Sequence, residues 1–113
     1  MKKIEAIIRP ERLNEVKNAL ETGGFVGLNI VHVTGRGAQK GIVHTGRGGE
    51  TYTVDMLPKL KIETVVKDAD LERAVELIVG AARTGNIGDG KIFIIPVEDA
   101  VRVRTGERGD VAV

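Results

Sequence analysis

The sequence lacks cysteine, which excludes disulfide bonds and thiolate-bound metal centres and is typical of an intracellular protein. Aromatic residues make up only 3% of the 113 residues, so the core has to be built from Ile, Val, Leu and Ala. No apolar run approaches the roughly 18 residues of a membrane span, and the N-terminus has no signal-peptide stretch. Because 17 Lys and Arg balance 16 Asp and Glu, no basic field attracts nucleic acid. We therefore expect one soluble domain, residues 1–113, in the cytoplasm.

An internal repeat organises the chain. The segment KIEAIIR at residues 3–9 recurs as KIETVVK at residues 61–67, an offset of 58 (61 minus 3). Both segments are rich in Ile and Val and predict β-strands. A stripe of apolar residues with helical spacing follows each strand, and a second apolar run, at 28–33 or 91–97, closes each half. The stripes comprise Leu13, Val16 and Leu20 in the first half and Leu71, Ala74 and Ile78 in the second.

The order strand–helix–strand, loop, strand–helix–strand predicts an α+β fold of the ferredoxin-like type. Two such units form a four-stranded antiparallel sheet with both helices on one face, and we expect a short strand in the C-terminal segment, residues 98–113. The strands are apolar almost throughout, which is typical of strands buried on both faces. Because helices would cover only one face, we predict that another copy of the chain covers the other, in a homo-oligomer.

Three elements carry groups that suit phosphate. The first is TGRGAQKG, residues 34–41, in which glycines follow a strand as they do in a dinucleotide-binding turn. The residues beyond it predict no helix, which such a turn requires. They form instead a connection from about residue 37 to 55, longer than the ~12–15 residues usual for a loop in a compact domain. We interpret it as a mobile functional loop, with a disordered linker as the alternative.

The second element is TGNIGDGK, residues 84–91, whose glycines allow left-handed backbone and expose successive N–H groups. Such a nest binds anions, and Lys91 adds a charge; an ordinary glycine-rich turn is the alternative. The third is VRVRTG, residues 101–106, where an extended chain would place Arg102 and Arg104 on one side, suited to a polyphosphate. A charged edge that discourages aggregation is the alternative here. Together the three elements favour nucleotide binding.

In these motifs the chain resembles the PII family of nitrogen-regulatory signal proteins over essentially its whole length. TGNIGDGKIFIIPV is similar to the family's C-terminal signature, and MKKIEAIIRP, GRGAQKG, VDMLPKLKIE and RVRTGE stand in the family's order and spacing. The resemblance implies a non-enzymatic homotrimer that binds ATP or ADP between its subunits and, with ATP and Mg²⁺, 2-oxoglutarate. It also implies that the long loop docks on an ammonium transporter or a nitrogen-metabolism enzyme, so that the membrane is reached only through the transporter.

The resemblance also assigns site residues by position. It implies that Gln39, Lys40, Gly41 and Lys59 surround 2-oxoglutarate, and that Gln39 meets the Mg²⁺ held with ATP. The residues implied for the nucleotide are Asn29, Gly35, Gly37, Ala38, Gln39, Glu63, Val65, Gly88, Asp89, Gly90, Lys91, Arg102 and Arg104.

Three positions depart from the family's pattern. Ala38 stands where many members have an arginine that reaches phosphate, which bears on the choice between ATP and ADP, and Asn29 stands where a threonine is common. The loop has GRGGETY in place of the uridylylation signature, with one extra residue and no first tyrosine. Tyr52 is the candidate for modification, but we expect signalling by ligand state alone.

Other functions of a ferredoxin-like domain fit less well. RNA binding needs paired aromatic residues on adjacent strands, which Phe25, Tyr52 and Phe93 do not supply. An ATPase would need a Walker motif, which is absent, so any hydrolysis should be weak. Two histidines and no cysteine make a poor metal site. An oligomeric binding protein of the same fold without a 2-oxoglutarate response stays as the alternative.

Overall fold

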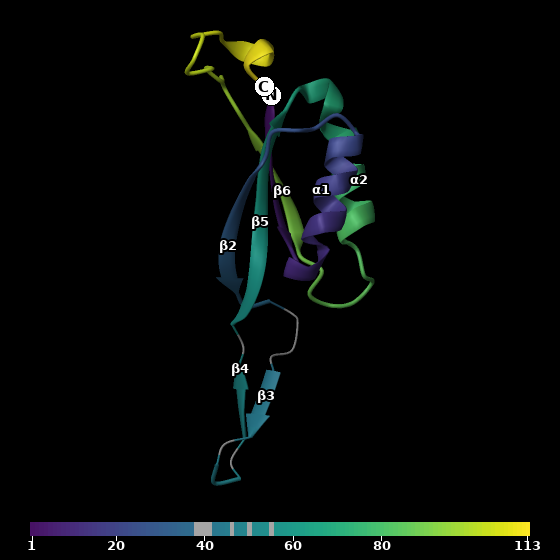
Figure 1. The fold of residues 1–113 in the computed structure, drawn as a ribbon, viewed down its shortest axis with the longest axis vertical. Coiled ribbons are helices and arrows are strands. Elements are labelled where there is room, and N and C mark those ends of the chain that lie inside the picture. Colours follow the sequence, from purple (N-terminus) through teal and green to yellow (C-terminus); the bar gives the residue numbers. More distant parts are fainter. Residues whose placement is uncertain (38–41, 46, 50, 55) are drawn as a thin grey trace.

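Two strand–helix–strand halves build the body of the protein (Figure 1). The structure, a computed structural model, describes residues 1–37, 42–45, 47–49, 51–54 and 56–113, with only the backbone for 42–45 and 51–54. The first half contains β1 (Lys2–Ile8), the short 3-10 helix η1 (Pro10–Arg12), α1 (Leu13–Thr22) and β2 (Asn29–Gly35). The second half contains β5 (Leu57–Val66), the 3-10 helix η2 (Asp68–Asp70), α2 (Leu71–Ala82) and β6 (Lys91–Pro96).

The four long strands form one antiparallel sheet in the order β2-β5-β1-β6. The two repeated segments, β1 and β5, are its central strands and pair along the whole of β1, from Lys2 opposite Val66 to Ile8 opposite Leu60. Both helices lie on one face of the sheet (Figure 1). The predicted ferredoxin-like arrangement is confirmed, because each helix buries its apolar stripe against the same face.

The core lies between the two helices and this face of the sheet. Successive side chains of a strand point to opposite faces, and every second residue of the two central strands is turned towards the helices. The sheet contributes the buried side chains of Ile4, Ala6, Ile8, Leu60, Ile62 and Val66, and the helices contribute Val16, Leu20, Ala74 and Ile78.

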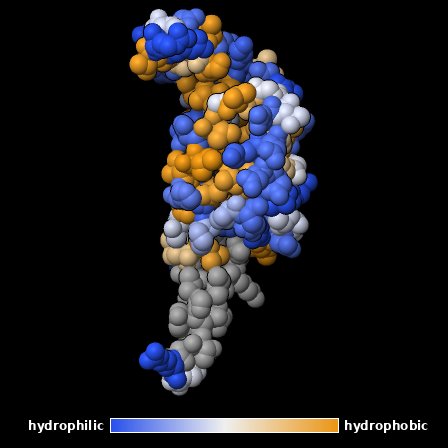
Figure 2. Space-filling model, viewed as in Figure 1, coloured by the Kyte–Doolittle hydropathy of each residue, from blue (hydrophilic) through white to orange (hydrophobic). Residues whose placement is uncertain are grey.

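The opposite face of the sheet has no helix over it. Val31, Phe93 and Ile95 point to this face and are 38%, 49% and 38% exposed, respectively. Figure 2 shows apolar residues gathered along the strand layer, whereas the helix side is largely polar. The core of one chain therefore explains the apolar residues on the helix side of the strands, but not those on the opposite face.

The connection between the halves contains a hairpin that we did not expect from the sequence. Its strands, β3 (Ile42–Thr45) and β4 (Thr51–Val54), pair antiparallel, with His44 opposite Tyr52. The β-branched residues of both segments were the available signal, since such residues favour strands. The long connection thus carries a two-stranded sheet separate from the main one.

The prediction of a short strand in the C-terminal segment is wrong. Residues 101–108 form a turn closed by one bridge between Val101 and Arg108, and the 3-10 helix η3 (Gly109–Ala112) follows. Within the turn, the Arg102 guanidinium pairs with the Glu107 carboxylate at 2.9 Å, and the backbone N–H of Gly106 donates to the carbonyl of Arg102 at 2.7 Å. The segment closes on itself because Gly106 adopts a positive φ of 73° and so reverses the chain.

We predict that Ile62→Ala lowers the free energy of unfolding by about 2–5 kcal/mol, because it leaves a cavity where a fully buried side chain was. Val26→Ala is the control, since Val26 is 78% exposed, and it should change stability by no more than about 0.5 kcal/mol. Urea unfolding at one fixed protein concentration measures both variants. Equal losses in the two variants would contradict this placement of the core.

Candidate functional site

A cavity of about 540 Å³ opens at the end of the sheet where β2 ends and β6 begins. The first two glycine elements meet there because β2 and β6 run in opposite directions, so the turn after one lies beside the loop before the other. Among the predicted site residues, those that line this cavity are Gly35, Gly37, Lys59, Gly88, Asp89, Gly90 and Lys91.

The loop before β6 is organised around the carboxylate of Asp89. One oxygen, Oδ2, accepts hydrogen bonds from the backbone N–H groups of Thr84 at 2.8 Å and Gly85 at 2.9 Å. The other oxygen accepts from the Thr84 hydroxyl and from Nε of Arg9. These donors, the Thr84 hydroxyl above all, hold the pKa of Asp89 far below its usual range. The side chain of Asp89 therefore holds the loop in shape, and its negative charge is neutralised by hydrogen bonds and an ion pair within the chain.

Two cations from the sheet hold the carbonyl groups of the same loop. Arg9, which follows β1, donates from Nη2 to the carbonyl of Ile87 at 2.7 Å, in addition to its ion pair with Asp89 at 3.0 Å. Lys59 of β5 donates from Nζ to the carbonyl of Gly88 at 2.6 Å. Burial, and then the nearby charge of Arg9, lower the pKa of Lys59. With these oxygens occupied by cations, the loop offers few acceptors to an incoming anion.

Glycine is required where the loop joins β6. A Cβ atom at Gly90 would lie 1.7 Å from the carbonyl oxygen of Ile7, and the φ of Gly90 is +100°. Gly88 also has a positive φ, of 104°. These conformations are open to glycine at no steric cost, so the loop can press against β1.

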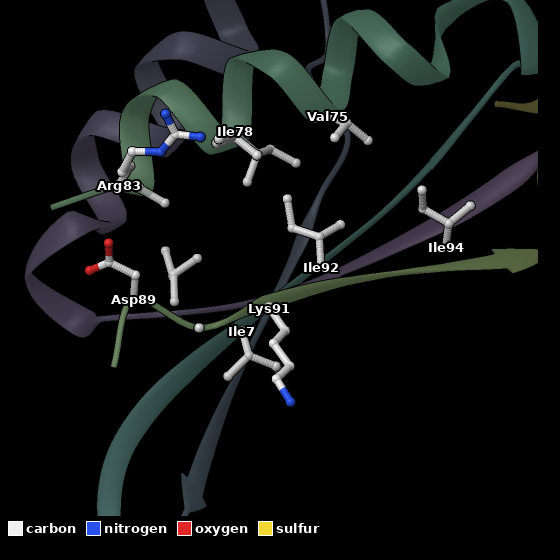
Figure 3. Close-up of a pocket in the computed structure, with 12 residues that line it drawn as sticks. Ile7, Val75, Ile78, Arg83, Asp89, Lys91, Ile92 and Ile94 are labelled. Atoms are coloured by element: carbon white, nitrogen blue, oxygen red, sulfur yellow. The ribbon is translucent and has the colours of Figure 1, made fainter. Parts of the chain in front are cut away.

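Lys91 and its neighbour Ile92 point to opposite sides of β6 (Figure 3). On the helix side, Ile92 and Ile94 face Val75 and Ile78 of α2 across an apolar pocket of about 330 Å³. Lys91 points away from α2, together with Ile7 of β1. The ammonium group of Lys91 thus lies on the helix-free face of the sheet, and Lys91 lines the 540 Å³ cavity.

A second hollow of about 460 Å³ collects the residues predicted to lie near the base, Asn29, Glu63 and Val65. Lys3 also lines it, and its ammonium bridges Glu63 at 2.7 Å and Glu5 at 3.0 Å. The hydrogen bond from Lys3 lowers the pKa of Glu63. Glu63 is therefore an ionised hydrogen-bond acceptor, suited to an amino or hydroxyl donor.

Other predicted residues are not brought to the cavity. Arg102 and Arg104 follow β6 at its far end, beside the chain termini and away from the loop of residues 84–91 (Figure 1). Ala38, Gln39, Lys40 and Gly41 lie outside the described residues, as does the side chain of Tyr52. Within the described part of the chain, no cluster of three or more acidic or histidine side chains could hold a metal ion.

Sequence reasoning missed several residues of the site. Arg9 follows the first strand and had no motif of its own, and Thr84 was seen only as the start of a glycine loop. Arg36 stood inside the TGRGAQKG motif, yet it was given no role when its neighbours on both sides were assigned; the structure includes Arg36 in the cavity lining. Ile87 and Phe93 complete the apolar part of the lining.

The fold and the cavity define a ferredoxin-like α+β protein with a glycine-built, cation-rich pocket at one end of its sheet. A family model described as Nitrogen regulatory protein P-II matches residues 1–107. The chain belongs to this family, whose members are non-enzymatic signal transducers. None of the described helices has the length and apolar character needed to cross a bilayer.

Similar proteins cover the whole chain. Nitrogen regulatory protein P-II 2 of Methanothermobacter thermautotrophicus is 58% identical over 113 residues, which span 100% of this chain and 97% of the relative. Nitrogen regulatory protein P-II of Cereibacter sphaeroides is also 58% identical, with 100% of both chains covered. The protein of the same description from Rhodospirillum rubrum is 56% identical, again with 100% of both chains covered.

We predict that Asp89→Asn lowers the unfolding temperature at neutral pH, because an amide presents one acceptor oxygen in place of two. A depressed pKa means that the carboxylate stabilises the fold above its unfolded pKa of about 3.9 and that this stabilisation is lost as the pH falls. The difference between variant and wild type should therefore stay constant from pH 7 to about pH 5 and shrink as the pH falls through about 3.9 towards the depressed folded-state pKa. Thermal melts across this range measure it.

Glu76→Gln is the control, since Glu76 is an exposed carboxylate of α2. It should leave the melting temperature close to that of the wild type at every pH. A difference between Asp89→Asn and wild type that stays constant over the whole pH range would contradict the assigned role of the Asp89 carboxylate.

Proposed function

We propose that this chain senses adenine nucleotides and passes their state to a partner protein that controls nitrogen assimilation. One observation carries the proposal: three cations, Arg36, Lys59 and Lys91, line a glycine-built cavity, and the one carboxylate among its described lining residues, Asp89, is turned into its own loop. Charge-assisted hydrogen bonds from such groups suit phosphate oxygens. The hollow at Asn29, Glu63 and Val65 would take the base and ribose. Mg²⁺ would accompany ATP, with Gln39 as its contact.

The proposed site is completed by a second copy of the chain. Arg102 and Arg104 are proposed phosphate ligands, yet they lie at the far end of the sheet from the cavity of their own chain (Figure 1). The helix-free face carries exposed Val31, Phe93 and Ile95, a surface that association would cover. A homotrimer, as the family resemblance implies, would satisfy both features and would form in the cytoplasm.

Lys59 is the proposed partner of a 2-oxoglutarate carboxylate, with Gln39, Lys40 and Gly41 around the rest of that ligand. Its ammonium already contacts the Gly88 carbonyl, so a carboxylate ligand would compete with the nucleotide loop for the same cation. We propose that the connection of about residues 37–55 docks on the target, such as an ammonium transporter or a nitrogen-metabolism enzyme. Ligand state, with no modification of Tyr52, would set its docking conformation.

Calorimetry tests the proposal on the wild-type protein. We expect ATP and ADP each to bind with saturable heat, and 2-oxoglutarate to bind only when ATP and Mg²⁺ are present. Absence of ATP and ADP binding at millimolar ligand would refute nucleotide sensing. ATP binding without any 2-oxoglutarate binding would favour the alternative, an oligomeric binding protein without that response.

We predict that Arg104→Ala weakens ATP binding roughly tenfold to a hundredfold, the effect of one charge-assisted hydrogen bond worth about 1.5–3 kcal/mol. Lys91→Ala should weaken it similarly. If Arg104 reaches the cavity of a neighbouring copy, refolding the two variants together should restore some intact sites, each with Lys91 from one chain and Arg104 from the next. No recovery in the mixture would place Arg104 outside the neighbour's site.

A further inference from the structure

The apolar pocket of about 330 Å³ between α2 and β6 lies on the helix side of the sheet. Ile92 of β6 faces Val75 and Ile78 of α2 across it (Figure 3). The start of β6 lines both this pocket and the 540 Å³ cavity, but the side chain of Lys91 points to the opposite face. The two hollows are therefore separated by the sheet itself.

The pocket exists because α2 covers β6 only in part. β6 is an edge strand of the sheet. Ile94 lies opposite the buried Ile4 and so points to the helix side, yet it is 45% exposed. Ile78 and Ala82 of α2, which also line the pocket, are buried. Apolar walls that open at one edge suit an aliphatic chain, because binding removes its surface from water.

Charged side chains lie at one end of the pocket. Figure 3 shows Arg83 and Asp89 there, with Val75 and Ile94 at the other end. The Asp89 carboxylate is paired with Arg9 and with backbone N–H groups of its own loop. The guanidinium of Arg83 has no hydrogen bond or ion pair within the described part of the chain. Its paired N–H donors match the two oxygens of a carboxylate.

We propose that this pocket binds a small aliphatic carboxylate, with the chain between α2 and β6 and the carboxylate on Arg83. Mostly apolar walls with a few polar groups that fix the orientation are typical of small-molecule sites. The inference goes beyond the proposed function, because the ammonium of Lys91 and the proposed nucleotide lie on the other face of the sheet. A ligand here would contact the loop before β6 from the helix side, at Asp89 and Gly90.

Calorimetry with octanoate tests the proposal on the wild type, Arg83→Gln and Lys17→Gln. Lys17 is an exposed residue of α1, so its variant is a control with the same loss of charge. We expect saturable binding to the wild type, about tenfold or more weaker binding to Arg83→Gln, and no change in Lys17→Gln. The neutral 1-octanol should bind the wild type and Arg83→Gln equally. Each methylene removed from octanoate should weaken binding about fourfold, which corresponds to about 0.8 kcal/mol.

NMR of the isoleucine methyl groups locates the ligand. Octanoate should shift the signals of Ile78 and Ile92 and leave that of Ile95, which points to the helix-free face, unchanged. Shifts at Ile95 without shifts at Ile78 and Ile92 would place the ligand outside the pocket and overturn the proposal. The absence of octanoate binding at millimolar concentration, or equal affinity in the wild type and Arg83→Gln, would overturn it as well.

A pocket-filling variant separates a small ligand from a second copy of the chain as the occupant. Val75→Phe should abolish octanoate binding and leave the number of subunits, measured by light scattering, unchanged. A changed number of subunits in this variant, together with no octanoate binding by the wild type, would show that another copy covers the groove and that the proposal is wrong. Thermal melts verify that each variant is folded.

Discussion

The antiparallel pairing of β1 with β5 is the constraint on which the rest of the structure depends. These strands are the two copies of the internal repeat, and their register, with Glu5 opposite Glu63, sets the position of everything attached to them. β2 pairs with the outer side of β5, and β6 with the outer side of β1. Because β2 and β6 then run in opposite directions, the turn after Gly35 and the loop before Lys91 share one end of the sheet.

The charged groups at that end hold the loop before β6 in place. Asp89 is satisfied by Thr84, Gly85 and Arg9. Arg9 and Lys59 also occupy the loop carbonyls of Ile87 and Gly88. A glycine loop alone is an ordinary turn, whereas in this one the Asp89 carboxylate and the carbonyls of Ile87 and Gly88 are already paired, which favours an incoming anion. The close contact of Gly90 with Ile7 then links the loop directly to the central strand.

One chain offers only part of the proposed site. The sheet face without helices exposes Phe93 and Ile95, and the C-terminal turn holds Arg102 and Arg104 at the far end from the cavity. The proposed association of copies would account for both features. Nucleotide binding between copies would then couple the ligand to the packing of the subunits, which is how a protein without catalysis could transmit a signal.

The fold could be predicted from local patterns in the chain, because the repeat, the helical stripes from Leu13 and Leu71 and the Ile- and Val-rich strands all agree with a double βαβ plan. The glycines and Lys91 of the cavity lining could also be predicted, since glycine clusters mark turns with unusual backbone conformations and a lysine marks a positive charge. The sequence did not predict the β3–β4 hairpin, nor the turn at residues 101–108, where Gly106 and the Arg102–Glu107 pair override the extended pattern. The contacts of Arg9 and Lys59 depend on the tertiary structure, because the partners of Arg9 lie 78 and 80 positions away along the chain, and the partner of Lys59 29 positions away. Contacts at such separations leave no local pattern, and they exist only once strand pairing has placed the end of β1, the start of β5 and the loop before β6 at the same end of the sheet.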